Sequence, residues 1–349
     1  MIKWILGTIL VLLILSVILI IALQASTSWK TAETIRTPDE RFANLSDYPF
    51  EPNYVEIEGY RIHYVDEGPR DGQTILLMHG QPSWSYLYRH MIPPLAEAGY
   101  RVIAPDLVGF GKSDKPLKQS DHSYQMHVDV MTAFAREIGL ENVTLFAQDW
   151  GGLIGLRMVA EDQDRYARIM LSNTGLPAAS GIRGWIGYPM VRFLVWREGK
   201  PDSVADENGK FRFSRWIAYA RHSENFTLES LFQGATSRTL SDAELAGYAA
   251  PFPDESYRAA TRIFPMMVPS QLRQNQKVMD EVFAKWDKPF LTAFGDSDPV
   301  TAGGDKIWQD TVPGASGQPH TIIKDGNHFI QEDKPEELVQ HLLAFIEAN

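Results

Sequence analysis

The segment of residues 145–152 constrains this chain most, because its sequence LFAQDWGG predicts a strand, a sharp turn and a helix in immediate succession. Residues 143–147 form a continuous apolar run, typical of a strand buried on both faces of a sheet. Small residues stand two positions before and two positions after Asp149. This is the pattern of a nucleophile elbow, a strained turn that exposes one side chain. We therefore take Asp149 as the candidate nucleophile, at a position where such elbows usually carry serine.

Composition excludes several function classes. The 349 residues include 33 Lys and Arg against 44 Asp and Glu, a net charge of −11, so we expect no nucleic-acid partner. The chain has no cysteine, which excludes disulfides, thiolate nucleophiles and thiolate metal ligands. Its length allows one large core with an insertion.

The first 25 residues stand apart from the rest. Residues 4–23 carry no charge, and about 20 apolar residues suffice to cross a bilayer as a helix. We expect residues 1–25 to form a hydrophobic helix that anchors the protein in a membrane. A secreted protein is the alternative, if the segment is cleaved as a signal peptide near residues 22–25. The few basic residues around the segment do not indicate which side of the membrane the domain faces.

The remaining chain alternates strands with helices, which predicts an α/β fold with a mostly parallel, doubly wound sheet. A hairpin is expected over residues 54–65, with its turn at Glu58 and Gly59. Further strands are expected at residues 74–78, 101–104, 143–147, 168–172, 289–294 and 321–323. Helices are expected at residues 83–95, 122–139, 151–161, 256–267, 276–286 and 335–349.

The alternation stops between residues 176 and 250. This stretch is dense in aromatic side chains and contains no clear strand pattern. We expect residues 176–250 to form a helical cap inserted into an α/β core, which residues 26–175 and 251–349 would build.

Polar residues follow four of the predicted strands, at the carboxyl ends where ligands bind in such sheets. They are residues 79–82, Asp149, the loop that contains Asp298, and His328. The chain order of nucleophile, acid and histidine is that of the α/β-hydrolases. We therefore predict a catalytic triad of Asp149, Asp298 and His328.

Each of these residues has a simpler structural explanation when taken alone. An aspartate before two glycines often caps a helix, and Asp298 before a proline fits a turn. His328 alone could be a loop histidine with satisfied hydrogen bonds. Their order on successive strand ends favours catalysis instead. The acid is not expected after the preceding strand, because Asn173 stands there, and Asp296 is expected only to support the turn around Asp298.

Five stretches of the chain resemble haloalkane dehalogenases, most closely the branch whose catalytic acid follows the later strand. They read HGQPSWSYLYRHMIP, FAQDWGGLIGL, YAAPFPDESYRA, FGDSDP and GNHFIQED. The resemblance covers nearly everything after the N-terminal segment. It implies an α/β-hydrolase core with a helical cap, hydrolytic cleavage of carbon–halogen bonds, and no cofactor or metal. The expected partners are a small halogenated aliphatic substrate and water, and the sequence carries no indication of oligomeric state.

An aspartate nucleophile suits this chemistry. Its attack on an sp³ carbon leaves an alkyl ester, whereas a serine would leave an ether that water does not readily cleave. His328 is expected to activate the water that hydrolyses the ester, and Asp298 to orient the imidazole and stabilise its charged form. The backbone N–H groups of Trp150 and Gln81 are the expected oxyanion donors.

Indole N–H groups are expected to hold the leaving halide, because they donate hydrogen bonds and cannot act as bases. Trp150 is placed for this role beside the nucleophile. The family branch takes a second tryptophan from the cap, and Trp216 matches it best. The remaining candidates are the side chain of Gln81, as a further halide donor, and Phe264, as a wall of the pocket.

An epoxide hydrolase is the nearest alternative, because it uses the same elbow and the same triad. It would need two cap tyrosines to protonate the epoxide oxygen, and Tyr219 and Tyr248 are available. A fluoroacetate-type dehalogenase would need arginines beside the nucleophile, where Trp150 and Gly151 stand. A membrane-tethered binding module on an inactive hydrolase scaffold would have lost a triad residue, and none is lost.

Overall fold

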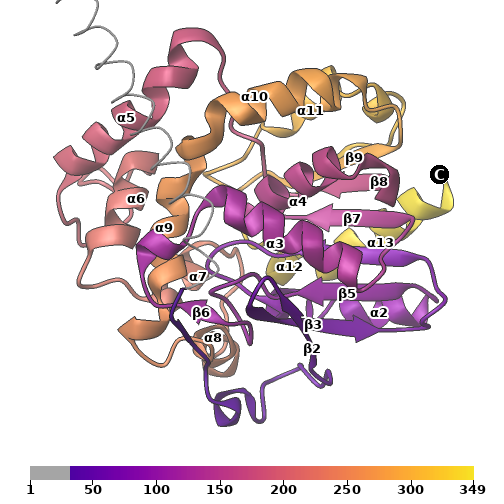
Figure 1. Cartoon of the computed structure of the whole chain (residues 1–349), viewed down its shortest axis with the longest axis horizontal. Helices are drawn as coiled ribbons and strands as arrows, with labels where there is room; N and C mark the ends of the chain where they lie inside the picture. Colours follow the sequence, from indigo (N-terminus) through magenta and orange to yellow (C-terminus); the bar gives the residue numbers. More distant parts are fainter. Residues whose placement is uncertain (1–31) are drawn as a thin grey trace, which may run out of the picture.

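An eight-stranded sheet organises the protein, and its strand order is β10-β9-β8-β7-β4-β5-β3-β2 (Figure 1). The computed structural model describes residues 32–349. The strands are β2 (Asn53–Ile57), β3 (Tyr60–Glu67), β4 (Thr74–Met78), β5 (Arg101–Pro105), β7 (Val143–Ala147), β8 (Tyr166–Leu171), β9 (Phe290–Gly295) and β10 (Thr321–Ile323). β3 is antiparallel to both of its neighbours, and the other neighbouring pairs are parallel. A separate antiparallel pair joins β1 (Thr34–Ile35) to β6 (Lys115–Pro116).

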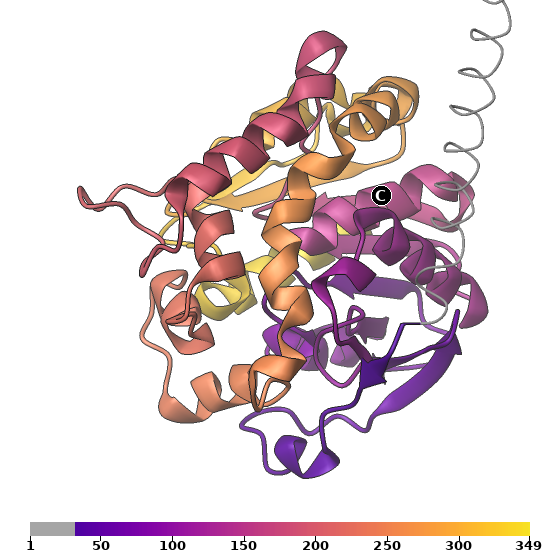
Figure 2. The same ribbon diagram turned by 60° about the vertical axis from the view of Figure 1, so that its left-hand side comes forward.

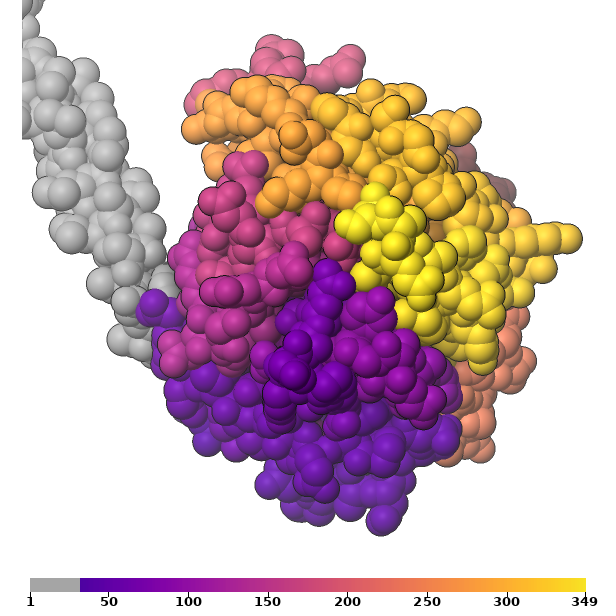
Figure 3. Space-filling view, turned by 90° about the vertical axis from the view of Figure 1, so that its right-hand side faces the viewer, coloured from indigo at the N-terminus to yellow at the C-terminus, as the bar shows by residue number. Residues whose placement is uncertain are grey.

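Helices cover both faces of the sheet, as parallel strands require. In Figure 1, α3 and α4 lie in front of the strands, and α13 lies behind them. All five residues of β4 and of β7 are buried, which explains their uninterrupted apolar sequences. Figure 3 shows α13 beside the N-terminal part of the chain, where it contacts α2.

The helices of the sheet layers are α2 (Ile92–Glu97), α3 (Tyr124–Glu137), α4 (Trp150–Glu161), α10 (Leu272–Glu281), α11 (Asp305–Thr311), α12 (Ile330–Asp333) and α13 (Pro335–Glu347). The predicted hairpin and strands are present, with ends shifted by at most two residues. The short helix α11 and the β1–β6 pair were not predicted.

The predicted helix over residues 83–95 is wrong as a single element. The chain forms a 3₁₀ turn at Ser85–Tyr88, and α2 begins only at Ile92. Pro93 and Pro94 explain the break, because proline lacks an N–H and fits only the first turn of a helix. The helix expected at residues 276–286 instead spans Leu272–Glu281.

Between residues 176 and 250 the chain forms helices. They are α5 (Gly181–Glu198), α6 (Phe213–His222), α7 (Leu228–Gly234) and α8 (Asp242–Ala249), and α9 (Ala259–Met267) follows them. Loops separate these helices, and the loop between α5 and α6 contains an isolated β-bridge between Ala205 and Phe211. Figures 1 and 2 show these helices beside the carboxyl ends of the parallel strands, where the sequence predicts the site.

No helix within residues 32–349 is long and apolar enough to cross a membrane. The hydrophobic helix expected over residues 1–25 lies outside the described residues. The expected membrane-anchored localisation is therefore corrected, since no element of the described chain provides an anchor.

A buried carboxylate holds the loop that follows β5. Asp106 is fully buried, and its carboxylate lies 2.7 Å from Nδ1 of His63. It also accepts hydrogen bonds of 2.8 Å from the backbone N–H groups of Ser85 and Lys112. Burial alone would raise the pKa of Asp106, but the charge and hydrogen bond of His63, together with the backbone donors, hold it below its ordinary value.

Asp106→Ala is expected to lower the free energy of unfolding by about 2–4 kcal/mol, because it leaves buried donors without an acceptor. Urea unfolding measures this change, with Asp71→Asn on the exposed surface as a control that stays within about 0.5 kcal/mol. Since the folded pKa is depressed, the contribution of Asp106 is present above about pH 4 and is lost as the pH falls. An Asp106→Ala protein as stable as its parent at pH 7 would contradict the structural role.

Candidate active site

Asp149 occupies the turn between β7 and α4 in a strained backbone conformation, with φ 48° and ψ −126°. Two glycines near Asp149 stand where neighbouring atoms leave no room for a side chain. A Cβ on Gly151 would lie 1.9 Å from the carbonyl oxygen of Met78, and a Cβ on Gly80 would lie 2.3 Å from the Asp149 carboxylate. The turn therefore has the geometry predicted for a nucleophile elbow.

The Asp149 carboxylate has one oxygen anchored and the other directed to an imidazole. Its Oδ1 accepts a 2.7 Å hydrogen bond from the backbone N–H of Gln81. Its Oδ2 lies 3.5 Å from Nε2 of His328. The backbone N–H of Trp150, the first residue of α4, has no acceptor within the described part of the chain. Both predicted oxyanion donors are thus adjacent to this carboxylate in sequence or in space.

Asp298 lies on the far side of the imidazole. Nδ1 of His328 donates to its Oδ2 at 3.1 Å. Asp298 is buried, and it also accepts from the Val300 backbone N–H at 2.8 Å and from the Thr301 hydroxyl. The structure therefore brings the three residues of the predicted triad into one row.

The two carboxylates shift the ionisation of the imidazole. Burial by itself lowers the pKa of His328, but Asp298 and Asp149 together raise it to about 10. Burial would likewise raise the pKa of Asp298, and the charge of His328 holds it below its ordinary value. At neutral pH the row therefore contains a charged imidazole between two carboxylates.

Two amide side chains that sequence reasoning did not assign to the site hold the His328 loop. Gln148 donates from Nε2 to the carbonyl oxygen of His328 at 2.9 Å. Asn173 donates to the carbonyl oxygen of Asn327 at 2.7 Å and accepts from the Gly295 backbone N–H at 2.8 Å. In the sequence, Asn173 marks only a position at which the catalytic acid could stand. The sequence feature that could have identified Gln148 and Asn173 is their position just after a buried strand.

Asp296 is exposed, and its carboxylate does not contact His328. Its Oδ1 accepts from the backbone N–H of Asp325 at 2.9 Å and from the hydroxyl of Ser297 at 2.8 Å. It therefore links the loop after β9 to the loop after β10.

A cavity of about 240 Å³ borders Asp149, and Gln81, Trp150, Trp216 and His328 are among its lining residues. Neither indole N–H, of Trp150 or of Trp216, has an acceptor among residues 32–349. The side chain of Gln81 donates from Nε2 to the carbonyl oxygen of Thr261 at 3.0 Å, so one of its amide hydrogens is already engaged.

The structure places Phe264 behind the cavity wall. Its ring packs 4.7 Å from that of Trp150 (centroid to centroid) and is fully buried, and the nearby residues Pro265 and Val268 are among those that line the cavity instead. Two other tryptophans of the same region, Trp185 and Trp196, lie on the outer face of α5 with 66% and 76% of their surface exposed.

The two tyrosines that an epoxide hydrolase would need point elsewhere. The hydroxyl of Tyr219 donates to the carbonyl oxygen of Asn225 at 2.9 Å, and that of Tyr248 donates to the carboxylate of Glu332. Among the described residues that line the cavities at Asp149, neither tyrosine is found. This arrangement gives no support to epoxide opening.

Comparison with known proteins agrees with this geometry. Residues 73–335 match the family model of the alpha/beta hydrolase fold. A haloalkane dehalogenase of Psychrobacter cryohalolentis is 46% identical over 324 residues, which cover 90% of this chain and 98% of the relative. The chain belongs to the haloalkane dehalogenases. Another member, from Mycolicibacterium paratuberculosis, is 43% identical with the same coverage.

Solved structures of the family have the same fold. Haloalkane dehalogenase DpaA from Paraglaciecola agarilytica NO2, solved as a tetramer, aligns with a TM-score of 0.73 and 30% identity, covering 89% of this chain and 98% of DpaA. A putative ancestral haloalkane dehalogenase aligns with a TM-score of 0.67 and 26% identity, over 85% of this chain and 100% of that protein.

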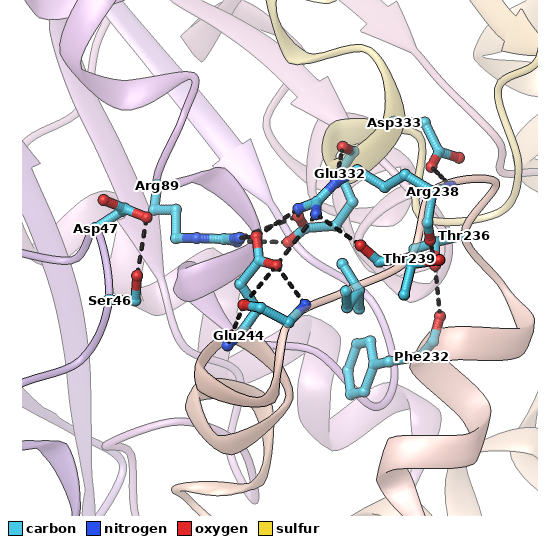
Figure 4. Close-up of polar contacts among 12 residues, drawn as sticks. Ser46, Asp47, Arg89, Phe232, Thr236, Arg238, Thr239, Glu244, Glu332 and Asp333 are labelled. Atoms are coloured by element: carbon cyan, nitrogen blue, oxygen red, sulfur yellow. Dashed lines mark hydrogen bonds and ion pairs between the residues drawn. The ribbon is translucent and has the colours of Figure 1, made fainter.

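A cluster of charged side chains joins the helices of residues 213–249 to the sheet layers (Figure 4). Arg89 lies 2.9 Å from Glu244 and also pairs with Glu332, and Arg238 pairs with the same two glutamates. His90, Glu244 and Glu332 are close enough to one another to hold a metal ion. The two guanidinium groups already neutralise these carboxylates, so the cluster is not suited to a cation.

Asp298→Asn is expected to lower the pKa of His328 from about 10, because it removes the nearer of the two anionic partners. Asp149→Asn is expected to lower it less. Titration of the imidazole by NMR measures both, and Asp296→Asn is a matched control that leaves the value unchanged. An unchanged His328 pKa in both Asp149→Asn and Asp298→Asn would contradict the charged row.

Proposed function

We propose that this protein hydrolyses haloalkanes to an alcohol and a halide ion through an ester formed on Asp149. The proposal rests chiefly on one observation, the row of Asp149, His328 and Asp298 beside a cavity lined by Trp150 and Trp216, whose indole N–H groups have no acceptor among residues 32–349. The names of the relatives agree with it. A bound metal or organic cofactor has no part in the proposed reaction.

In the first step the free carboxylate oxygen of Asp149, Oδ2, attacks the carbon that bears the halogen. A carbon–oxygen bond forms as the carbon–halogen bond breaks, and the halide leaves with the bonding electrons. The indole N–H groups of Trp150 and Trp216 donate to the halide as its charge develops. The apolar cavity strengthens these interactions because it excludes water.

In the second step water attacks the carbonyl carbon of the ester. Esterification removes the charge of Asp149, which is one of the two charges that raise the pKa of His328. The imidazolium can then lose its proton and accept one from the attacking water. The oxyanion develops on Oδ1, next to the Gln81 N–H. As it collapses, the carbon–oxygen bond to the alkoxide breaks, the imidazolium gives its proton to the alkoxide oxygen and the alcohol is released. The carboxylic acid left on Asp149 then passes its proton to His328, which restores the carboxylate and the charged imidazole.

We also propose that residues 176–250 act as a cap on a core formed by residues 26–175 and 251–349. The cap residues Phe211, Phe213 and Trp216 line the cavity, while Asp149 and His328 come from the core. A charge cluster of the buried Arg89 and Glu332 with the partly exposed Arg238 and Glu244 connects the two parts (Figure 4). Under this proposal the cap supplies halide donors and excludes water, and the core supplies the triad.

Halide release from 1,2-dibromoethane and 1-bromobutane tests the reaction, with styrene oxide as the substrate of the alternative. Asp149→Asn is expected to lower kcat by at least about 10³-fold, because the amide is a poor nucleophile. His328→Phe is expected to stop after the first step, so that mass spectrometry detects an alkyl group on Asp149. Turnover of styrene oxide without halide release from either bromide would overturn the proposal.

Trp150→Phe and Trp216→Phe each remove one indole donor and are expected to weaken bromide binding by about tenfold or more. Quenching of intrinsic fluorescence by bromide, or calorimetry, measures the dissociation constant. Trp185→Phe is the matched control, because this indole lies on the outer face of α5 and is expected to leave bromide binding unchanged. If the Trp216→Phe protein binds bromide with unaltered affinity, Trp216 is not the halide donor from the cap.

A further inference from the structure

Gln148, the residue before the nucleophile, has a side chain that reaches the imidazole of His328. The glutamine is fully buried. Its Nε2 donates a 2.9 Å hydrogen bond to the backbone carbonyl oxygen of His328, and the same nitrogen lies 3.4 Å from Nε2 of the imidazole ring. Gln148 therefore contacts the ring atom that exchanges protons in the proposed reaction, in addition to the loop that carries it.

The backbone of the elbow fixes the position from which this side chain extends. The Gln148 N–H donates to the carbonyl oxygen of Met78 at 3.2 Å, and the Gln148 carbonyl oxygen accepts from the Gly151 N–H at 2.9 Å. The strand that ends one residue earlier, β7, is buried along its whole length. The amide group is therefore held at both ends, by the elbow and by the His328 carbonyl.

The hydrogen bond to the His328 carbonyl also decides which end of the amide faces the imidazole. Rotating the amide by half a turn would bring Oε1 against that carbonyl oxygen, and two acceptors repel each other. The Oε1 atom is buried and has no hydrogen-bond partner among residues 32–349. Leaving a buried amide oxygen unpaired is unfavourable. The orientation nevertheless keeps a donor, and not an acceptor, beside Nε2 of His328.

A donor fixed beside Nε2 distinguishes the two protonation states of the imidazole. Nδ1 of His328 donates to Asp298 at 3.1 Å, so Nε2 is the nitrogen that gains or loses a proton. In the imidazolium, the N–H groups of Gln148 and His328 face each other and neither can accept. In the neutral imidazole, Nε2 has a lone pair within reach of the Gln148 N–H. A hydrogen bond made only to the neutral form favours that form.

The charged groups that face His328 oppose this effect until the ester forms. They are Asp298 and Asp149, which together raise the pKa of His328 to about 10. While both carboxylates are ionised, one neutral amide does not displace the proton from Nε2. Once Asp149 is an ester, Asp298 is the remaining charged partner, and the contribution of Gln148 coincides with the step that needs the neutral ring.

Gln148 and the attacking water reach Nε2 from different sides. His328 lines the cavity of about 240 Å³ at Asp149, whereas Gln148 does not. A separation of 3.4 Å is also longer than a strong hydrogen bond, so the amide leaves the nitrogen accessible to water.

We propose that Gln148 is a positioning residue for the second step of the proposed reaction, where it favours the neutral imidazole that accepts a proton from the attacking water. The inference rests on the proposed function, since it concerns the same ester. After the halide has left, the proton on Nε2 passes to solvent. Water then gives a proton to Nε2 as its oxygen bonds to the ester carbonyl carbon. Gln148 itself exchanges no proton.

The test follows the two steps separately with 1-bromobutane. Bromide release in a rapid-quench experiment measures alkylation, and intact-protein mass spectrometry measures the decay of the alkyl group on Asp149 after the substrate is removed. Gln148→Met removes the donor and is expected to slow the decay about fivefold, and Gln148→Glu, which places an acceptor beside Nε2, at least about tenfold. Alkylation is expected to keep its rate, because the imidazole stays charged during that step.

Gln163→Met and Gln163→Glu are the matched controls. Gln163 is an exposed residue of the 3₁₀ turn Gln163–Arg165, so neither change is expected to alter either step.

A second readout separates an effect on protonation from an effect on structure. Asp149→Asn is a stable substitute for the ester, because its side chain carries no charge. In this background the pKa of His328, measured by NMR, is expected to rise when Gln148 is replaced by Met and to rise further when it is replaced by Glu. A side chain that only holds the loop does not predict this order.

Circular dichroism establishes that the variants are folded, and two substitutions are used so that one unfolded variant does not decide the result. Unchanged ester decay in the folded variants, or alkylation that slows in parallel with ester decay, would overturn the inference and leave the proposed function standing. A parent protein that releases no bromide and forms no alkyl group on Asp149 would overturn the proposed function, and the inference with it.

Discussion

One imidazole lies between two carboxylates, and the chemistry of the site depends on this arrangement. The two anions stabilise the charged form of His328, which raises its pKa to about 10 despite its burial. The same charges link the state of the nucleophile to the state of the base. When Asp149 becomes an ester, His328 loses one anionic partner and its pKa falls. The imidazole therefore becomes easier to deprotonate at the step that needs its neutral form.

The fold supports this row through contacts between strand ends that are far apart in the chain. Asn173, after β8, accepts from the Asp149 N–H at 3.1 Å through its backbone carbonyl. Its side chain contacts Gly295 at the end of β9 and the carbonyl groups of Asn327 and His328 after β10. One amide residue therefore ties the nucleophile loop, the acid loop and the histidine loop together.

The helices between residues 176 and 282 add the space that the triad needs. α6 carries Trp216 to the small cavity, while α5 and α10 line a second and larger cavity that also borders Asp149. The row of charged groups is thus bordered by a small cavity that Trp150 and Trp216 line and by a larger, mainly apolar cavity. Such a division suits a substrate with one polarisable leaving group and an apolar remainder.

The sequence by itself determined the elements whose signals are local. The elbow at Asp149, the hairpin turn at Glu58 and Gly59, and the buried strands follow from residue spacing and steric requirements within a few positions. The order of Asp149, Asp298 and His328 also indicated the row, because parallel strands bring their carboxyl ends to one edge of the sheet. The helix predicted over residues 83–95 was wrong because the apolar pattern alone does not reveal where a helix starts. Pro93 and Pro94 fit only the first turn of a helix, so the helix begins at Ile92.

Only the tertiary structure decided which aromatic side chains reach the site. Trp216 lines the small cavity, Trp185 faces outward and Phe264 lies one layer behind Trp150, although all four belong to segments rich in aromatic residues. The same holds for the two cavities and for the contacts of Asn173. These features depend on how helices and strands separated by a hundred residues or more pack together, and no pattern within a single element encodes that packing.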